Sequence, residues 1–229
     1  VLAVAGLCLS LLHQSSLGAT YGVLKARPLW YKPDLSILFI VSAVAAGLSI
    51  TVFATLLVSK LRRGVILDRG AVDGVGRAIA IALLAYLYLK FWDALAVTYT
   101  YVPGRNEGLN LLTDGPLSFN FWFGEVIFGA LIPLYVLLSP RRRANDILLM
   151  LATALVVGGV VAYRWDVNLA GLMTVVALQP LDAVTRYAHY SPALVEYVAA
   201  AGIVSFGLLA FTLGARVLGV VDHTRAAEA

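Results

Sequence analysis

The feature that most constrains this chain is a series of long apolar runs, each about the length of a membrane-crossing helix. A helix satisfies its backbone polar groups internally, so it can cross lipid without help. The second run is the clearest, because no charged residue occurs between Asp34 and Lys60. Six segments are predicted as transmembrane helices: 1–24, 35–59, 75–101, 117–138, 147–163 and 192–218.

The composition agrees, since 61% of the residues are hydrophobic and 13% are charged. Soluble domains are closer to half apolar and a quarter charged. The sequence therefore predicts an all-α integral membrane protein, a bundle of about six helices in one transmembrane domain over 1–229. Residues 167–178 are apolar but number only about twelve, too few to cross a core of roughly 30 Å. We expect a re-entrant or surface-lying segment near 165–190.

The basic residues predict an orientation. Loops on the side that holds Arg62, Arg63 and Arg141–Arg143 carry more Lys and Arg than those on the other side. Because the cytoplasmic loops of membrane proteins are enriched in these residues, that side is predicted to be cytoplasmic. Loops 25–34, 102–116 and 164–191 should then face outward. Since these arginines follow the topology signal, no nucleic-acid partner is expected.

Polar side chains interrupt the first apolar run near its middle, at His13, Gln14, Ser15 and Ser16. Polar groups in hydrocarbon are costly unless each finds a partner. We therefore expect these four side chains to face protein or a ligand rather than lipid.

Ionisable side chains also occur inside the later segments. Asp93 and Glu125 are each about 12 Å below the outer face, at 1.5 Å per helical residue. A charge at the centre of a helix costs about 2.5–3.5 kcal/mol on insertion scales. Such groups therefore pair with one another or serve a polar cavity. The set near the outer face is Lys90, Asp93, Glu125, Arg164, Asp166 and Glu196.

Two interpretations of these charges stay open. In the structural one, Lys90 pairs with Asp93 and Glu125 pairs with Arg164, and both pairs only hold helices together. In the functional one, the charges exchange protons with the outer aqueous phase. Intramembrane ionisable residues favour the functional interpretation.

Several chemistries are disfavoured. The chain has three histidines, and only His13 falls in a predicted helix, so a haem held by two histidines is not expected. The single cysteine, Cys8, cannot hold an iron–sulfur cluster alone. No cluster of Cys and His residues indicates a metal site. We find no glycine loop of the phosphate-binding kind and no nucleophile motif.

A polar pocket in an apolar, aromatic frame remains, with Trp92 among the aromatic residues. A quinone head group needs hydrogen bonds to two carbonyl oxygens, exchangeable protons and an apolar slot. Histidine and carboxylates can supply the protons. A proton pathway or a transporter would use the same groups, so the residues alone do not decide between them.

Six short motifs in a fixed order carry a resemblance. LHQSSLG at 12–18 is followed by PLWY at 28–31, and FWD at 91–93 precedes GE at 124–125. YRWD at 163–166 and YSPALVE at 190–196 complete the series. Together they resemble the NrfD/polysulphide-reductase membrane-subunit family over essentially the whole chain. Within that family, the nearest likeness is to the membrane subunit of hydrogenase-2-type complexes.

The resemblance implies a quinone-binding membrane subunit of a multi-subunit respiratory oxidoreductase. It implies menaquinone or ubiquinone as the bound molecule, with no haem and no iron–sulfur cluster on this chain. The partners would be an iron–sulfur, ferredoxin-like electron-transfer subunit and a catalytic redox subunit. The location would be a bacterial or archaeal cytoplasmic membrane, with docking on the outer, periplasmic side. Family members carry helices before the histidine motif, so we expect this chain to be the C-terminal portion of a longer subunit.

The resulting hypothesis gives each candidate residue a role. His13 would exchange a proton with a quinone oxygen, with Gln14, Ser15 and Ser16 as hydrogen-bond partners and Trp92 in the frame. Asp93 and Glu125 would exchange protons with the outer face, and Arg164 would hold or tune a carboxylate. Lys90, Asp166 and Glu196 complete the proton-transfer set.

Three alternatives remain beside this hypothesis. The chain could form half of a proton channel in the same kind of complex, or it could be a plain anchor without a quinone site. A secondary transporter is disfavoured, because no internal repeat appears. Whether the subunit is itself catalytic stays open.

Overall fold

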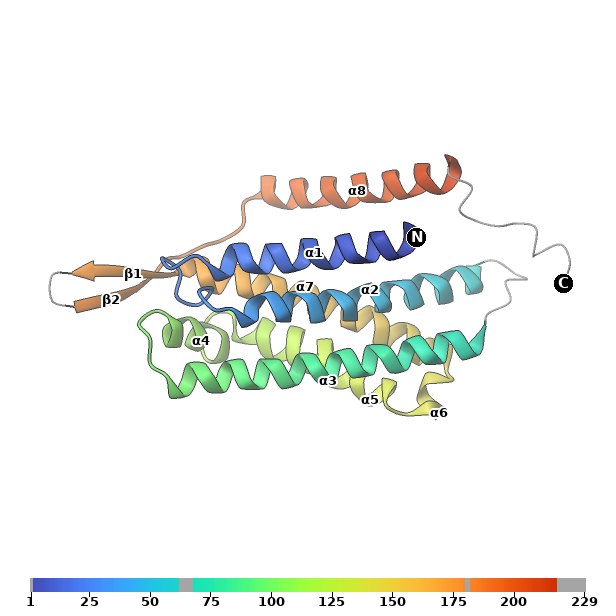
Figure 1. Ribbon diagram of the computed structural model, residues 1–229, viewed down its shortest axis with the longest axis horizontal. Coiled ribbons are helices and arrows are strands. Elements are labelled where there is room, and N and C mark those ends of the chain that lie inside the picture. Colours follow the sequence, from blue (N-terminus) through green and yellow to red (C-terminus); the bar gives the residue numbers. More distant parts are fainter. Residues whose placement is uncertain (1, 62–67, 180–181, 218–229) are drawn as a thin grey trace, which may run out of the picture. The chain divides into compact units, whose positions relative to one another are not determined.

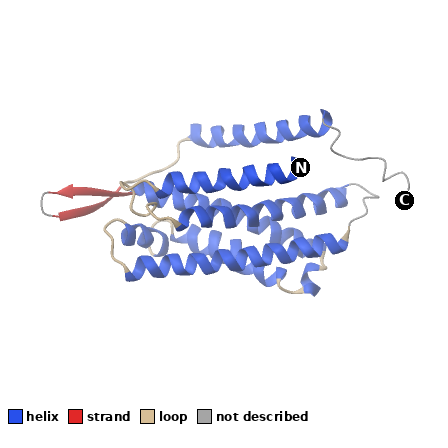
Figure 2. Ribbon diagram, in the orientation of Figure 1, coloured by secondary structure: helices blue, strands red, loops and turns tan. Residues whose placement is uncertain are grey.

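The computed structural model describes residues 2–61, 68–179 and 182–217, and within these the chain is mostly helical with one pair of strands (Figure 2). Two compact units, Val1–Ala188 and His189–Ala229, are each described by themselves. The elements are α1 (Leu2–Gly22), α2 (Asp34–Leu61), α3 (Arg69–Tyr99), α4 (Arg105–Thr113), η1 (Asn120–Leu131), α5 (Ile132–Leu137), α6 (Pro140–Arg143), α7 (Asp146–Met173), β1 (Thr174–Gln179), β2 (Asp182–Tyr187) and α8 (Leu194–Val217).

Five helical stretches in the described part of the chain are long and apolar enough to cross a membrane: α2, α3, η1 with α5, α7 and α8. The predicted all-helical membrane class is confirmed. α1 occupies the first predicted segment and is 21 residues long, but it is not among the five. Its second half contains the polar stretch 13–16. The predicted single domain over 1–229 stays a prediction.

Within the first unit, α1, α2, α3, η1 with α5, and α7 run lengthwise as a bundle (Figure 1). α7 packs against α2, α4, η1 and α5, and α2 also contacts α1 and α3. The α1–α2 loop, α4 and the two strands gather at one end of the bundle, which we call the hairpin end (Figure 1). The loops predicted to face outward therefore share one end of this unit.

Aromatic side chains form one core cluster of this unit. Tyr163 of α7 meets Tyr86 of α3 with ring centroids 5.4 Å apart and Phe39 of α2 at 6.2 Å, both nearly edge to face. Trp30 from the α1–α2 loop and Leu35 are buried in the same cluster. Edge-to-face rings fix one another's orientation. This cluster holds α2, α3 and α7 in register beside the polar residues.

A close approach of two backbones fixes η1 against α7. A Cβ atom at Gly129 would stand 2.5 Å from the Gly159 Cα, and one at Gly159 would stand 2.2 Å from the Gly129 Cα. Only glycine at both positions allows this contact. η1 is a π-helix of 12 residues, in which residues five apart stack on one face. Asn120 and Glu125 therefore share a face of η1.

The region 165–190 differs from the prediction. Residues 165–173 continue α7, and strands 174–179 and 182–187 pair antiparallel, with Thr174 opposite Tyr187 and Gln179 opposite Asp182. The described residues of this region thus form a helix end and two strands rather than a re-entrant segment, and a position on the membrane surface stays a prediction. β-branched residues 174–176 favour a strand directly after the helix. As a result, Arg164 lies nine residues before the end of α7 (Met173), about 14 Å inside the helix rather than at its mouth.

Candidate functional site

Two ion pairs join elements near the hairpin end. Lys32, just before α2, binds Asp93 of α3, and Lys90 Nζ of α3 lies 2.5 Å from Glu125 Oε1 of η1. The Glu125 side chain is 1% exposed and that of Lys90 is 15% exposed. The expected pairs, Lys90 with Asp93 and Glu125 with Arg164, are therefore wrong. Lys90 reaches across to η1, which leaves Asp93 to the loop lysine.

Glu125 lies in a buried aromatic setting. The Tyr86 hydroxyl donates a hydrogen bond of 2.5 Å to Glu125 Oε1, the atom that Lys90 also contacts. The Lys90 ammonium lies 4.5 Å from the Tyr163 ring centroid and 5.3 Å from that of Phe121. Glu125 Oε2 is buried without a hydrogen-bond partner among the described residues. One carboxylate oxygen is therefore held and the other is left to bind a proton or a polar molecule.

Asp166 of α7 has a similar arrangement. Asn120 Nδ2 donates to Asp166 Oδ1 at 2.8 Å and to the Ala162 carbonyl at 3.2 Å. The other oxygen, Asp166 Oδ2, is buried and has no partner in the described part of the chain. Because Asn120 and Glu125 are stacked on η1, the two carboxyl groups lie near the same face of that helix. Buried oxygens without partners are rare and need an explanation.

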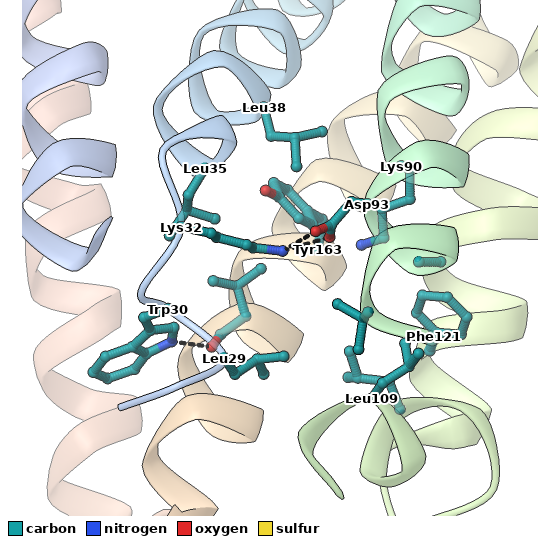
Figure 3. A pocket seen from close by; sticks show the side chains of 14 residues that line it. Leu29, Trp30, Lys32, Leu35, Leu38, Lys90, Asp93, Leu109, Phe121 and Tyr163 are labelled. Carbon is teal, nitrogen blue, oxygen red and sulfur yellow. Dashed lines mark hydrogen bonds and ion pairs between the residues drawn. The ribbon is translucent and has the colours of Figure 1, made fainter. Parts of the chain in front are cut away.

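A small cavity is lined by Lys90, the partner of Glu125, and by Lys32, Asp93 and Tyr163 (Figure 3). Lys32 and Asp93 point toward each other inside it, and Lys90 and the Tyr163 ring lie beside them (Figure 3). Its volume is about 40 Å³, enough for water-sized molecules. Sites for small organic molecules usually measure 300–1,000 Å³. The cavity therefore suits protons and water rather than an organic ring. Its apolar wall is formed by Leu29, Trp30, Leu35, Leu38, Ala94, Val97, Leu109, Leu112, Phe121 and Val167.

Trp30 closes the cavity toward the hairpin end. Its Nε1 donates to the Val167 carbonyl at 2.7 Å (Figure 3). A Cβ at Gly171 would stand 2.0 Å from Trp30 Nε1, so the indole fits only because residue 171 has no side chain. Leu29 and Trp30 of the PLWY motif are thus buried against the polar cavity, whereas Tyr31 is exposed.

A larger hollow, which we call the groove, opens between α1, α2 and α7. It measures about 470 Å³, within the range of small-molecule sites. Most of its walls are apolar, and the polar side chains converge from α1 and α7. The lining residues are Gln14, Leu17, Tyr21, Phe39, Ala43, Ala46, Val160, Arg164 and Asn168.

Arg164 is the charged group of the groove. Its Nη2 donates to Gln14 Oε1 at 3.2 Å, to the Phe39 carbonyl at 3.0 Å and to Ser42 Oγ at 3.2 Å. The guanidinium carbon lies 3.5 Å from the Phe39 ring centroid. No carboxylate pairs with Arg164 among the described residues, so the expectation that it holds one is wrong. All three bonds use Nη2, so the other N–H groups of Arg164 have no hydrogen-bond partner among the described residues and could bind a ligand.

The groove also has a polar wall toward the hairpin end. The Tyr21 hydroxyl donates to Asn168 Oδ1 at 2.7 Å, and Asn168 Nδ2 donates to the Arg164 carbonyl at 2.8 Å. These bonds tie the end of α1 to α7. They fix the rim near Arg164 and keep the groove open at its middle.

The other candidates on α1 lie around the groove rather than in it. His13 is exposed in the described chain, and Ser15 is half-buried. Ser16 Oγ donates to the carbonyl of His13 at 2.9 Å. His13 is four residues before Leu17, and side chains at this spacing lie on one face of a helix. Because Leu17 lines the groove, His13 is placed at its edge.

Two candidates are not brought into either hollow. Trp92 is 51% exposed and contacts Tyr88 and Phe91 on its own helix, and it lines neither the cavity nor the groove. Glu196 belongs to the second unit, where it accepts a hydrogen bond from the Tyr190 hydroxyl.

Sequence reasoning missed several residues that complete the site. Lys32 falls in the loop 25–34 and so enters only the orientation signal, although its position two residues before Asp34 and directly after the PLWY motif could mark it. Asn120 is uncharged and gives no signal in the sequence, and Tyr163 is part of the YRWD motif but is given no role there. No group of three or more His, Cys, Asp and Glu residues that could hold a metal occurs in the described ranges. The expected lack of haem and clusters stays a prediction.

Comparison with known proteins gives a family match. Residues 1–177 match the family described as polysulphide reductase, NrfD. The chain is 27% identical to the integral membrane subunit of a menaquinone reductase from Nitratidesulfovibrio vulgaris, over 94% of this chain and 52% of the relative. It is 23% identical to a selenate reductase subunit from Mesobacillus selenatarsenatis, over 98% of this chain and 52% of the relative.

A third relative, a membrane subunit of a proposed dimethyl sulfoxide reductase from Halobacterium salinarum, is 25% identical over 94% of this chain and 52% of its own length. The chain thus spans about half the length of the curated relatives it matches. The narrower likeness to hydrogenase-2-type membrane subunits stays a prediction.

Proposed function

This chain belongs to the polysulphide reductase NrfD family, and we propose that it is a quinone- or quinol-binding membrane subunit of a multi-subunit respiratory oxidoreductase. The names of its relatives support this proposal: one is a menaquinone reductase membrane subunit and two are subunits of other reductases. We propose menaquinone or ubiquinone as the ligand, and an iron–sulfur, ferredoxin-like subunit as the electron-transfer partner of this chain. A catalytic redox subunit would complete the complex.

The groove is the proposed site of the quinone head group. The single observation that carries this assignment is Arg164, a cation inside the bundle with no carboxylate partner among the described residues and with free N–H donors. A quinone oxygen gains electron density on reduction, and a charge-assisted hydrogen bond to it is stronger than a neutral one. The apolar walls from Leu17, Ala43 and Val160 suit the ring and the start of its tail.

His13 is proposed to exchange a proton with the quinone from the edge of the groove. Imidazole titrates near neutral pH, which suits a group that both gives and takes a proton. Gln14 would hydrogen-bond a quinone oxygen through its amide N–H, since its Oε1 accepts from Arg164. Ser15 and Ser16 would support quinone binding from the same stretch of α1. Trp92 stays a proposed quinone-binding residue, although it does not line the groove.

The cavity is the proposed proton-transfer region. Asp93 and Glu125 would exchange protons with the hairpin end, which we propose faces the outer, periplasmic side of a bacterial or archaeal cytoplasmic membrane. Lys32 and Lys90 would hold these carboxylates through the observed ion pairs. Asp166, with one free buried oxygen, would extend the region along η1. Glu196 stays a proposed member from the second unit.

A proton half-channel through the whole bundle has less support. The hydroxyls of Thr51, Thr55 and Ser59 on α2 donate to carbonyls of their own helix at 2.9, 2.8 and 2.8 Å. A chain of water toward the other end would have to form around side chains that are already engaged. The plain-anchor alternative is decided by the binding experiment below.

The test is quinone binding by the intact detergent-purified complex, titrated with a short-chain menaquinone analogue. Arg164→Gln should weaken binding about 10- to 100-fold, because a hydrogen bond to a charged group contributes about 1.5–3 kcal/mol. The matched control is Arg141→Gln, an exposed arginine of α6 that contacts neither hollow. Equal affinity of Arg164→Gln and the parent complex would remove the quinone from the groove. No binding by the parent would favour the plain anchor.

A further inference from the structure

The cavity and the groove lie on opposite sides of one seam, where α2 packs against α7. Along both helices, consecutive residues line different hollows, because neighbouring positions on a helix point about 100° apart. We call this line of contact the α2–α7 seam. The pairs, with the cavity residue first, are Leu38 and Phe39, Tyr163 and Arg164, and Val167 and Asn168.

Tyr163 is the polar side chain on the cavity side of this seam. It lines the cavity, and the next residue, Arg164, lines the groove. Its ring is 1% exposed and is held edge to face by Phe39, which itself lines the groove. In Figure 3 the ring lies beside the Lys32–Asp93 pair, between Leu38 and Lys90. Tyr163 thus touches the walls of both hollows.

The Tyr163 hydroxyl is buried and has no hydrogen-bond partner among the described residues. A buried hydroxyl without a partner destabilises a fold, and phenylalanine would fill the same space without that cost. The other cavity-side residues of the seam, Leu38 and Val167, are apolar. On the groove side, the Ser42 hydroxyl is engaged by Arg164 and donates to the Phe39 carbonyl. Two buried hydroxyls lack a partner among the described residues, those of Ser49 and Tyr163, and of the two only Tyr163 lines one of the hollows.

We infer that the Tyr163 hydroxyl relays protons between the cavity and the groove. The inference rests on the proposed quinone function. Reduction of a quinone to a quinol takes two electrons, from the redox partner subunit, and two protons. In each transfer the phenol gives its proton toward a reduced quinone oxygen while its own oxygen takes one from the cavity side. The phenol is neutral before and after, and the net change is one proton moved from cavity to groove.

The test compares Tyr163→Phe with the parent in the intact complex. The substitution removes only the hydroxyl and keeps the ring that packs against Phe39 and Tyr86. Turnover with the menaquinone analogue should fall by at least about tenfold, as for the loss of a positioned proton-transfer group. The rate difference between H₂O and D₂O should grow, while the affinity for the analogue stays within about twofold. Tyr135→Phe, an exposed tyrosine of α5 that lines neither hollow, is the matched control and should behave as the parent.

The outcomes separate the relay from the quinone site. An unchanged turnover and isotope effect in Tyr163→Phe would overturn the relay, even if Arg164→Gln binds the analogue weakly and the quinone site stands. A loss of affinity without a change in the isotope effect would also overturn it, because Tyr163 would then only shape the groove. If Arg164→Gln binds normally, the quinone site itself fails, and that result does not depend on Tyr163.

Discussion

The Lys90–Glu125 pair offers the strongest test of the energetics of this bundle. The Glu125 side chain is 1% exposed, and its Oε1 is held by Lys90 and Tyr86. Lys90→Met would leave a buried carboxylate with one hydrogen-bond donor. Removing one partner of a buried pair destabilises a protein by about 3–5 kcal/mol. The unfolded state in detergent provides alternative partners, so the lower part of this range is expected here.

The double variant decides whether the loss comes from the uncompensated charge. Lys90→Met with Glu125→Gln removes both charges and keeps an amide oxygen for the Tyr86 hydroxyl. Because neutral replacements of buried pairs are often tolerated, this double variant should recover most of the lost stability. The free energy of unfolding is measured by SDS titration in mixed micelles, followed by circular dichroism. The control, Arg77→Met, removes an arginine whose side chain is 66% exposed and should change stability by less than about 1 kcal/mol.

Two results would refute this reasoning. The free energy of unfolding of Lys90→Met could equal that of Arg77→Met, which would mean that solvent or lipid head groups reach Glu125. The double variant could be no more stable than Lys90→Met alone, which would mean that packing of the lysine stem, rather than its charge, holds α3 to η1.

Two further substitutions test the packing around the site. Gly159→Ala should destabilise the fold by about 1–3 kcal/mol, because its Cβ would meet the Gly129 backbone. The control, Gly158→Ala, has open space around its Cβ and should leave stability unchanged. Both are measured by the same SDS titration. Trp30→Phe should lower the free energy of unfolding by about 0.5–1.5 kcal/mol for the lost hydrogen bond to Val167 alone. It should also speed hydrogen–deuterium exchange in the α1–α2 loop. Unchanged exchange would mean that the indole does not hold this loop against the cavity.

The membrane-spanning helices could be predicted because their signal is one-dimensional. The run between Asp34 and Lys60 became α2, Asp34–Leu61, and the predicted segment 75–101 became α3, Arg69–Tyr99. Hydropathy fixes which residues lie in the bilayer and says little about the loops. The strand pair 174–179 and 182–187 could not be predicted for that reason, since it is stabilised by pairing between two short strands and leaves no periodic hydropathy signal.

Ion-pair partners could not be predicted, because spacing along one helix does not fix rotation about its axis. Lys90 and Asp93 are three residues apart, a spacing that suits a pair on one helix face. In the fold, η1 approaches the Lys90 side of α3, and the loop before α2 brings Lys32 to Asp93. Lys90 and Asp93 therefore each pair with a residue of another element. Which residue each one pairs with depends on packing between segments that are distant in sequence.

The error at Arg164 had a single cause, the position at which α7 ends. A helix ending at Tyr163 would have put Arg164 at an outer mouth, where a carboxylate partner is easily supplied. Because α7 continues to Met173, Arg164 and Asp166 lie inside the bundle instead. The π-helical η1, which aligns Asn120 with Glu125, was also beyond sequence reasoning. The length of α7 and the π-helical turns of η1 both place polar side chains of the candidate site inside the bundle.

The charges near the hairpin end now divide into two kinds. Lys32 and Lys90 each face a carboxylate, so these pairs are close to neutral and can hold helices together. Among the described residues, Arg164 contacts an amide oxygen, a backbone carbonyl, a hydroxyl and an aromatic face, all of them uncharged. The groove therefore keeps a positive charge that no carboxylate of the described residues neutralises. A ligand whose oxygens become more negative during its reaction would be held most strongly in that state. Under the proposed function, this is why loss of the Arg164 charge should weaken binding while loss of the Tyr163 hydroxyl should slow turnover.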